Sequence, residues 1–449
     1  MNNQNNARQI FLAGVKGVLP GKLINDLISL KGSILKIGYR SYDLTQIQNV
    51  YVIGAGKASA AMAHYLESVL KGRITKGYVV TKYGHACSLR YITVSEAGHP
   101  VPDANSYKAA EEILKITGAA GENDLVICLW SGGGSSLLAD HPENSSQEEM
   151  ANLNDILVRC GADIAEINAV RKHLSKVKGG MLATHIAPAS FVNILLSDVI
   201  GDPPDIIASG PAVPDNSTFS DAIAIIEKYN LAEVLPNTLV SYLREGVNGL
   251  HPETPKPGAD VFKKSALFFA GSNKTALQCA RTEAEIRGFE TFIITDSLRG
   301  DTETACTYIV NEIKNRRAEN DLQKPVCLLF GGETTVKVTG EGAGGRNQHL
   351  ALYIAFHIKD IPGTTFLSAG TDGNDGNTDS AGAVVDSDTI RKARENNTDP
   401  ETYLKNFDSY NFFKTAGGLI LTGPTLTNVM DLMITLIDHP EPHSSQLKE

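Results

Sequence analysis

The sequence predicts an α/β protein of two domains, and three observations carry this prediction. The chain has 449 residues, too many for one ordinary core, and 42% of them are apolar. Short apolar runs alternate with longer segments of helical periodicity along most of the chain. Several of these runs end in glycine-rich or acidic loops, as the strands of open parallel sheets do.

The first half of the chain contains the alternation that predicts a parallel sheet. Its predicted strands cover residues 50–54, 77–81, 124–130 and 191–198. A helix is expected at 58–70 after the first strand, and Pro102 and Asp103 open another. The loops after the third and fourth strands are rich in glycine and in aspartate. We therefore expect a ligand site along the strand ends of this domain.

A linker is predicted at 251–257, where HPETPKP contains three prolines in seven residues. It sets the predicted domains at residues 1–250 and 251–449, and the first helix could pack on either one. The second domain is expected to be α/β with a mixed sheet. Its predicted strands cover residues 266–270, 291–295, 326–332, 334–340, 364–370, 382–386 and 418–423, and its predicted helices cover 273–287 and 302–315.

Composition excludes several classes of function. The formal net charge of -10 leaves no excess of basic residues for a phosphate backbone, which argues against a nucleic-acid partner. No apolar run reaches the 18 or so residues that a membrane span needs, so no membrane partner is expected. The six cysteines show no CxxC spacing, and Cys128 and Cys327 sit inside apolar runs. These features favour the reducing cytoplasm, and they leave the oligomeric state open, a homodimer included.

The GAGKAS loop joins a predicted strand to a predicted helix. Its Gly54 and Gly56, with the charge of Lys57, favour an anion at the helix start. The loop is not a P-loop, because a P-loop requires other residues at Tyr51 and Ala58, and it lacks the third glycine of a dinucleotide fingerprint. A tight turn with an exposed lysine is the alternative interpretation.

The SGGGSS loop is the stronger candidate for a triphosphate cradle. Three consecutive glycines let backbone N–H groups approach a polyphosphate, and the flanking hydroxyls add donors. The alternative is a flexible loop, but a glycine run costs folding entropy unless a ligand or close packing uses it. The candidate binding residues are Ser131, Gly132, Gly133, Gly134, Ser135 and Ser136.

Acidic loops offer ligands for a divalent cation beside those phosphates. Asp198 follows the fourth predicted strand, and Asp372 and Asp375 lie in a second acidic loop. Mg²⁺ needs only one or two carboxylates together with substrate oxygens, so these three aspartates are the predicted metal ligands. Turns built from Asp, Asn and Gly are an equally good interpretation of the second loop.

Three further features add polar groups to the set. Glu333 ends a predicted buried strand, and Arg346 and Asn347 begin a helix after a glycine-rich loop. The guanidinium of Arg346 suits a carboxylate or a moving phosphoryl group. The basic run at 168–180 is predicted to be a solvated helix, although in this acidic protein it could attract anions.

Taken together, these motifs resemble the glycerate 2-kinase family, also called the MOFRL family. The resemblance rests on GAGKASAAMA, LWSGGGSSLL, NAVRKHLSKVKGG, LLSDVIGDPPDIIASGP, GGETTVKVTGEGAGGRNQHLAL and AGTDGNDGNTDSAGAVVD. It implies a Rossmann-like N-terminal domain, a C-terminal α/β domain, ATP, Mg²⁺ and phosphorylation of D-glycerate at its 2-hydroxyl. By the same resemblance, Lys57 and Arg346 match the catalytic pair, and Asp198 and Glu333 match acidic positions of the cleft. One segment departs from the family pattern, with Leu426 in place of a glycine and Met430 in place of a polar residue.

These expectations combine into one mechanism. Lys57 and Arg346 are expected to meet across an interdomain cleft, one on the γ-phosphoryl group and the other on the glycerate carboxylate. Asp198 could accept the hydroxyl proton if it does not hold the metal. Replacing either cation by alanine is expected to abolish turnover while stability stays near wild type. The alternatives are a hydroxypyruvate reductase that uses a nicotinamide cofactor and, in another class, a sensor that binds without turnover.

Overall fold

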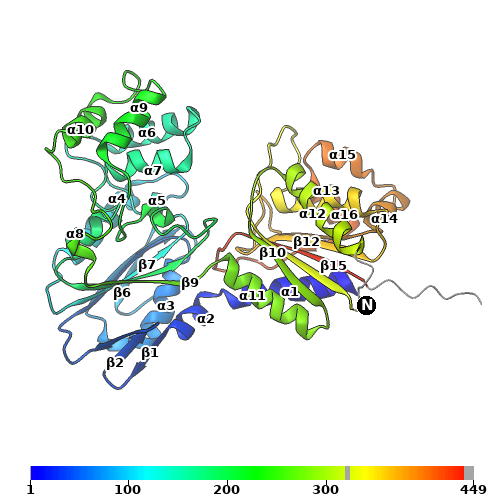
Figure 1. Ribbon diagram of the computed structural model, residues 1–449, viewed down its shortest axis with the longest axis horizontal. Helices are drawn as coiled ribbons and strands as arrows, with labels where there is room; N and C mark the ends of the chain where they lie inside the picture. The colour runs from blue at the N-terminus through cyan, green and yellow to red at the C-terminus, as the bar shows by residue number, and fades with distance from the viewer. Residues whose placement is uncertain (1, 319–323, 439–449) are drawn as a thin grey trace, which may run out of the picture. The chain divides into compact units, whose positions relative to one another are not determined.

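The computed structural model describes residues 2–318 and 324–438 of the chain (Figure 1). The chain forms two compact units. The N-terminal unit comprises Pro20–Ala270, and the C-terminal unit comprises Met1–Leu19 together with Gly271–Glu449. The division therefore differs from the predicted boundary near residue 250, and the first helix belongs to the C-terminal unit.

The N-terminal unit is built on a sheet of six strands in the order β6-β5-β4-β7-β8-β9. The strands are β4 (Val50–Ala55), β5 (Lys76–Lys82), β6 (Ile92–Ala97), β7 (Leu125–Ser131), β8 (Ser190–Leu196) and β9 (Ser265–Gly271). The pairs from β6 through β8 are all parallel, as the sequence predicts. Strands β4 and β7 are buried at every position, which explains their unbroken apolar sequences.

Helices cover both faces of this sheet, and a helical cap extends beyond it (Figure 1). The helices are α2 (Pro20–Leu27), α3 (Ser59–Leu70), α4 (Ala104–Thr117), α5 (Gly134–Leu137), α6 (Gln147–Arg159), α7 (Ile164–Lys172), α8 (Met181–Ile186), α9 (Phe219–Lys228) and α10 (Asn237–Val247). Helices α6, α7, α9 and α10 share a separate apolar core that includes Leu153, Val170 and Leu243. A small antiparallel sheet completes the unit, with β1 (Ile28–Lys31), β2 (Ile34–Ile37) and β3 (Arg40–Asp43).

The C-terminal unit contains a mixed sheet in the order β10-β11-β15-β12-β13-β14. Its strands are β10 (Glu290–Leu298), β11 (Val326–Gly332), β12 (Thr364–Gly370), β13 (Gly382–Asp386), β14 (Leu419–Ile420) and β15 (Asp431–Ile437). Only β10 and β11 pair in parallel, and the other four pairs are antiparallel. The mixed sheet predicted for this half is thus confirmed.

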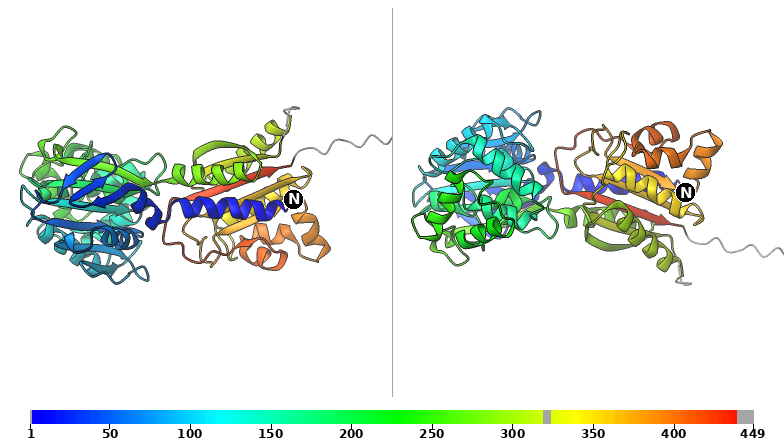
Figure 2. Two further views of the ribbon diagram at one scale, coloured as in Figure 1. Left: turned by 90° about the horizontal axis from the view of Figure 1, so that it is seen from below. Right: turned by 90° about the horizontal axis from the view of Figure 1, so that it is seen from above.

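Two helical layers enclose the mixed sheet. Helices α1 (Asn3–Gly17) and α11 (Asn273–Ile286) pack side by side on one face, as Figure 2 shows. The other helices are α12 (Thr302–Ala318), α13 (Arg346–Ile358), α14 (Thr389–Glu395), α15 (Pro400–Lys405) and α16 (Ser409–Ala416). Phe11 and Val15 of α1 are buried, as expected for an amphipathic first helix.

Three expectations about elements were wrong or incomplete. Strand β9 was assigned to the second domain, but it lies beside β8 and extends the first sheet. The strand predicted at 334–340 is absent, and in the described structure that segment contributes only an isolated bridge between Thr335 and Asp301. Strands β6 and β15 were not predicted. In the described residues, no helix is long and apolar enough to cross a bilayer.

Candidate active site

The winding of the N-terminal sheet reverses between β4 and β7. The chain runs outward from β4 to β5 and β6 on one side, and then returns to β7 and β8 on the other. In open α/β sheets, ligands bind at the carboxyl ends of the strands that flank such a reversal. The two loops at this point are those that contain Lys57 and Gly132, the two glycine-rich loops singled out in the sequence.

Backbone hydrogen bonds tie these two loops together. The N–H of Gly56 donates to the carbonyl of Val80 at 3.1 Å, and the N–H of Lys57 donates to the carbonyl of Gly132 at 2.9 Å. The N–H of Ala58 donates to Oγ of Ser131 at 3.0 Å. The amides of the GAGKAS loop are therefore used inside the protein, and the Lys57 side chain is the group that this loop offers to an anion.

Close packing accounts for the two glycines that precede Lys57. A β-carbon on Gly54 would lie 2.5 Å from the carbonyl oxygen of Leu129, and one on Gly56 would lie 2.1 Å from Oγ of Ser131. Gly56 also has a φ of 138°, which favours glycine. Both residues let β4 and its loop approach β7 closely, and their contact with a nucleotide stays a prediction.

Side chains from two neighbouring strand ends lie against Gly132 and Gly133. A β-carbon on Gly132 would lie 1.6 Å from Oδ2 of Asp198, so the carboxylate of Asp198 lies directly against this glycine. A β-carbon on Gly133 would lie 3.3 Å from Cε of Lys57. Lys57 follows β4, Gly132 follows β7 and Asp198 follows β8. The structure therefore brings together the cation, the glycine loop and the carboxylate that the sequence named.

The three serines of the loop have partners within the unit. Oγ of Ser131 accepts from Ala58, and Oγ of Ser136 donates to the carbonyl of Gly133 at 3.1 Å. The hydroxyls of Ser135 and Ser209 are 2.7 Å apart. Gly134 packs against Ala208, and a β-carbon added to Gly134 would lie 2.5 Å from the β-carbon of Ala208. These contacts fix the shape of the loop, while direct contacts of the serines with phosphate stay predictions.

The basic run at 168–180, which includes the end of α7, is not a solvated helix, contrary to the prediction. Lys172, His173 and Lys178 are buried, and Lys172 forms ion pairs with Asp205 at 3.1 Å and Asp215 at 3.0 Å. Basic side chains of this run point into the N-terminal unit, where they donate hydrogen bonds to the glycine loop.

Lys178 and Arg171 hold the carbonyl groups of that loop. Nζ of Lys178 donates to the carbonyl of Ser135 at 2.9 Å and also to that of Leu138. Nη2 of Arg171 donates to the carbonyl of Ser135 at 3.3 Å. Burial lowers the pKa of Lys178 to about 7. The predicted phosphate loop is thus supported by basic side chains, buried or partly buried, that sequence reasoning assigned to the surface.

Arg346 occupies the first position of α13 in the C-terminal unit. Its Nε and Nη2 donate to the buried carboxylate of Asp431, and its Nη1 lies 2.7 Å from Oε1 of Glu333. Burial opposes the charge of Arg346, but these carboxylates outweigh it and raise the pKa above the ordinary value. Within the described stretches of chain, these contacts use three of its five N–H groups and leave one further N–H on each Nη for a ligand.

Asp375 and Asn347 stabilise the start of α13. The carboxylate of Asp375 accepts from the backbone N–H of Asn347 at 3.0 Å and from that of Gln348 at 2.8 Å. The side-chain oxygen of Asn347 accepts from Ser368 at 2.6 Å. Burial raises the pKa of Asp375 to about 6. Both Asp375 oxygens are engaged with backbone, so the structure gives this residue a structural contact where the sequence predicted a metal ligand.

The other predicted metal ligands differ in setting. Oδ1 of Asp372 accepts from the N–H of Asn374 at 3.1 Å, the turn geometry that the sequence offered as the alternative. Asp198 lies beside the glycine loop. No group of three metal-ligating side chains is gathered anywhere in the two described stretches of chain. Among the three aspartates, Asp198 best fits an ion held by one carboxylate and phosphate oxygens.

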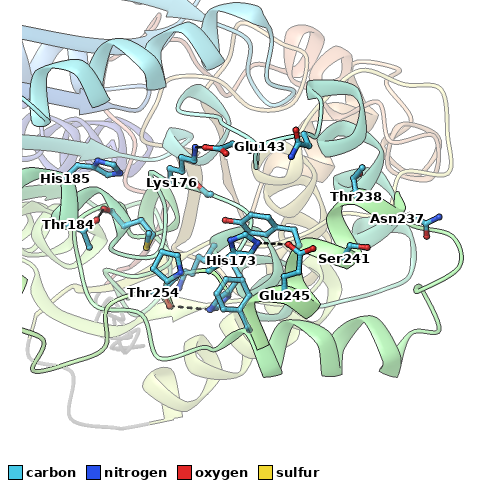
Figure 3. Close-up of a pocket in the computed structure, with 18 residues that line it drawn as sticks. Glu143, His173, Lys176, Thr184, His185, Asn237, Thr238, Ser241, Glu245 and Thr254 are labelled. Carbon is cyan, nitrogen blue, oxygen red and sulfur yellow. Dashed lines mark hydrogen bonds and ion pairs between the residues drawn. The ribbon is translucent and has the colours of Figure 1, made fainter. Parts of the chain in front are cut away.

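A cavity of about 830 Å³ lies elsewhere in the N-terminal unit, between α8, α10 and the segment after α7 (Figure 3). Its walls contain none of the predicted site residues. Several polar side chains in the walls are paired, including Lys176 with Glu143 at 2.8 Å and His251 with Glu245 at 2.9 Å. Ser175 in the wall donates to Asp140 at 2.5 Å.

Comparison with known proteins supports the interpretation of the sequence motifs. Residues 6–244 match a family model described as a domain of unknown function, DUF4147, and residues 326–431 match the MOFRL family model. A D-glycerate 2-kinase of Thermotoga maritima is 44% identical over 393 residues, which cover 87% of this chain and 91% of that protein. This chain belongs to the glycerate 2-kinase, or MOFRL, family.

Other relatives of this MOFRL protein agree in fold and differ in name. The crystal structure of a glycerate kinase from Thermotoga maritima superposes with a TM-score of 0.85 at 40% identity, covering 97% of this chain and 99% of that one. A protein of Agrobacterium vitis with the provisional name hydroxypyruvate reductase is 41% identical over 389 residues, which cover 86% of each chain. The family and the α/β fold class are thus confirmed.

Proposed function

We propose that this protein is a glycerate 2-kinase, which transfers the γ-phosphoryl group of ATP to the 2-hydroxyl of D-glycerate. One observation supports this most directly. Three groups meet where the winding of the parallel sheet reverses: the side chain of Lys57, the carboxylate of Asp198 and the backbone of Gly132 and Gly133. That arrangement offers a cation and close backbone approach at one place, as phosphoryl transfer requires.

Each group has a distinct task in this proposal. The Gly132–Gly134 backbone positions the phosphates, because no side chain keeps them at a distance. Lys57 stabilises the negative charge that develops on the moving phosphoryl group. Within residues 2–318 and 324–438, Nζ of Lys57 forms no hydrogen bond or ion pair, so its charge is available to a ligand.

Mg²⁺ would be held by Asp198 together with phosphate oxygens. When bound, the ion neutralises charge on the β- and γ-phosphate oxygens. Asp198 is otherwise the candidate to accept the proton of the glycerate hydroxyl, and the two tasks exclude each other at the same oxygen.

Arg346 and Glu333 are proposed to act in the same reaction from the C-terminal unit. The carboxylates of Asp431 and Glu333 orient the Arg346 guanidinium, and its remaining N–H groups suit the carboxylate of glycerate. Glycerate carries one carboxylate and two hydroxyls, so a fixed guanidinium would select the orientation that presents one hydroxyl.

A direct comparison of two assays tests this function. Purified protein should release ADP from Mg-ATP only when D-glycerate is present, and NMR of the product should show phosphate on the oxygen of C2. The same protein should not oxidise NADH with hydroxypyruvate. NADH oxidation without ADP release would favour the reductase, and binding of both substrates without any turnover would favour a sensor.

The structure supplies one argument against the reductase. In a dinucleotide-binding turn, the glycine loop offers backbone N–H groups to the pyrophosphate. Here the N–H groups of Gly56, Lys57 and Ala58 all donate to protein oxygens. A pyrophosphate on this turn would therefore find few donors.

A further inference from the structure

His99 lies at the same strand ends, although the mechanism above does not use it. It follows β6, which forms the edge of the parallel sheet. The segment after β6 brings its imidazole over the glycine loop, so that a β-carbon on Gly133 would lie 2.8 Å from both Cδ2 and Nε2 of His99. The same β-carbon would lie 3.3 Å from Cε of Lys57. His99 and Lys57 therefore flank one glycine.

The backbone around His99 is anchored independently of its ring. Asp103 caps α4 by accepting from the N–H groups of Asn105 at 3.0 Å and Ser106 at 3.2 Å. The same carboxylate accepts from the hydroxyl of Tyr83 at 2.6 Å, and it also accepts from the backbone of Gly98. In the described part of the chain, neither ring nitrogen of His99 hydrogen-bonds the protein. The imidazole is thus held in position with both nitrogens left for a ligand.

The electrostatic surroundings keep the imidazole neutral. Burial, Lys57 and Lys82 lower the pKa of His99 to about 4. At neutral pH the ring therefore carries one N–H donor and no charge. A neutral donor beside a lysine can bind a phosphoryl oxygen without repelling that lysine, and a group with so low a pKa is a weak general base.

We propose that His99 is a further catalytic residue, whose Nε2–H donates a hydrogen bond to the phosphoryl group held by Lys57 and the Gly132–Gly134 backbone. This inference rests on the proposed kinase function. It adds a fourth strand end, that of β6, to a site that otherwise draws on β4, β7 and β8. No proton moves in this role, because the imidazole only donates to an oxygen that gains charge in the transition state.

Kinetics of three variants test the proposal. His99→Ala should lower kcat for ADP release by about 100-fold, the usual effect of losing one preorganised donor, with little change in KM for D-glycerate. The amide of His99→Gln can replace Nε2–H as a donor. The kcat of His99→Gln should therefore be at least tenfold higher than that of His99→Ala. The exposed His64 of α3 provides the matched control, and His64→Ala should keep wild-type kcat.

A second readout separates this proposal from the kinase function. Histidine ring signals in the NMR spectrum of the whole protein can be assigned to His99 by their absence in His99→Gln. Addition of Mg-AMPPNP should shift these signals even if D-glycerate is not the acceptor. Wild-type kcat in His99→Ala would overturn the proposal, and so would an unshifted His99 ring signal in nucleotide-bound protein. The proposal would also be overturned if His99→Ala and His99→Gln lost kcat equally and both losses followed a loss of folded protein.

Discussion

Arg346 donates two hydrogen bonds to the buried carboxylate of Asp431, from Nε to Oδ2 at 2.6 Å and from Nη2 to Oδ1 at 2.9 Å. The pair joins the first turn of α13 to the first residue of β15. This contact makes Arg346 a structural residue of the C-terminal unit as well as a proposed catalytic one. The sequence-based expectation that Arg346→Ala would leave stability near wild type is therefore revised.

Arg346→Ala should reduce both turnover and stability. It leaves the fully buried Asp431 without its cation, and breaking such a pair costs about 3 kcal/mol of unfolding free energy. Arg346→Lys keeps a charge but loses the bidentate geometry, so it should lose turnover with a smaller stability loss. Urea denaturation and ADP release measure the two effects. The exposed Arg391 of α14 is the control, and equal stability of Arg346→Ala and Arg391→Ala would contradict the account.

Gly132→Ala should abolish most turnover. The new methyl group would lie 1.6 Å from the present position of Oδ2 of Asp198, so the carboxylate must move away from the loop. We expect kcat to fall by about 100-fold, as for a displaced catalytic group. Gly121→Ala is the control, because its β-carbon would meet only Oδ2 of Asp124 at 3.7 Å. Wild-type kcat in Gly132→Ala would show that the position of Asp198 is unimportant.

Lys178→Met should weaken the glycine loop in a pH-dependent manner. The change leaves the carbonyls of Ser135 and Leu138 without their donor, which costs about 2 kcal/mol. The pKa of Lys178 is about 7 in the folded protein against 10.5 ordinarily, so between these values the unfolded chain binds more protons. The contribution of Lys178 to the unfolding free energy of the wild-type protein therefore rises as the pH rises from about 7 towards 10.5.

Urea denaturation at pH 7, 8 and 9 measures this effect. The stability difference between wild type and Lys178→Met should widen as the pH rises. The partly exposed Lys176, which pairs with Glu143, is the control, and its Met variant should show a constant difference. A constant difference for Lys178→Met as well would show that its ammonium titrates normally.

Leu426→Gly should stabilise the protein. Leu426 has a φ of 63°, in the left-handed region that favours glycine, and its side chain is 48% exposed. Relief of backbone strain should exceed the entropy cost of glycine and raise the unfolding free energy by about 1 kcal/mol. Leu421, which is 63% exposed and lies outside that region, should lose stability when changed to glycine. A loss of stability in Leu426→Gly would refute the strain argument.

The parallel half of the fold could be predicted because its strands are buried on both faces. The runs of β4 and β7 are almost entirely apolar and lead into glycine-rich loops, so both the strands and their loops are visible in the sequence. β6 was missed because it lies at the sheet edge and mixes polar with apolar residues. His99 was missed with it, although the GHP triplet between a strand and a capped helix was a usable signal.

The roles of single side chains were harder to predict than their positions. Asp375 and Asn347 come from two polar, glycine-rich segments that were predicted to bind ligands. Both make hydrogen bonds that the sequence does not reveal, Asp375 to the first turn of α13 and Asn347 to Ser368, and their ligand contacts stay predictions. The basic run was assigned to the surface because charged residues are rarely buried without partners. Its partners are carbonyl groups of Ser135 and Leu138 and the carboxylate of Asp215, which composition does not reveal.

Turnover of Lys57→Met tests the central claim most directly. The substitution removes the ammonium from the end of β4 and keeps a side chain of similar length. ADP release with D-glycerate should fall at least about 1,000-fold, as when a cation on the moving phosphoryl group is lost, while the thermal midpoint stays within about 2 °C. Lys108→Met on the exposed side of α4 should keep full activity. Wild-type turnover in Lys57→Met would contradict the claim that the phosphoryl group is held at this strand end.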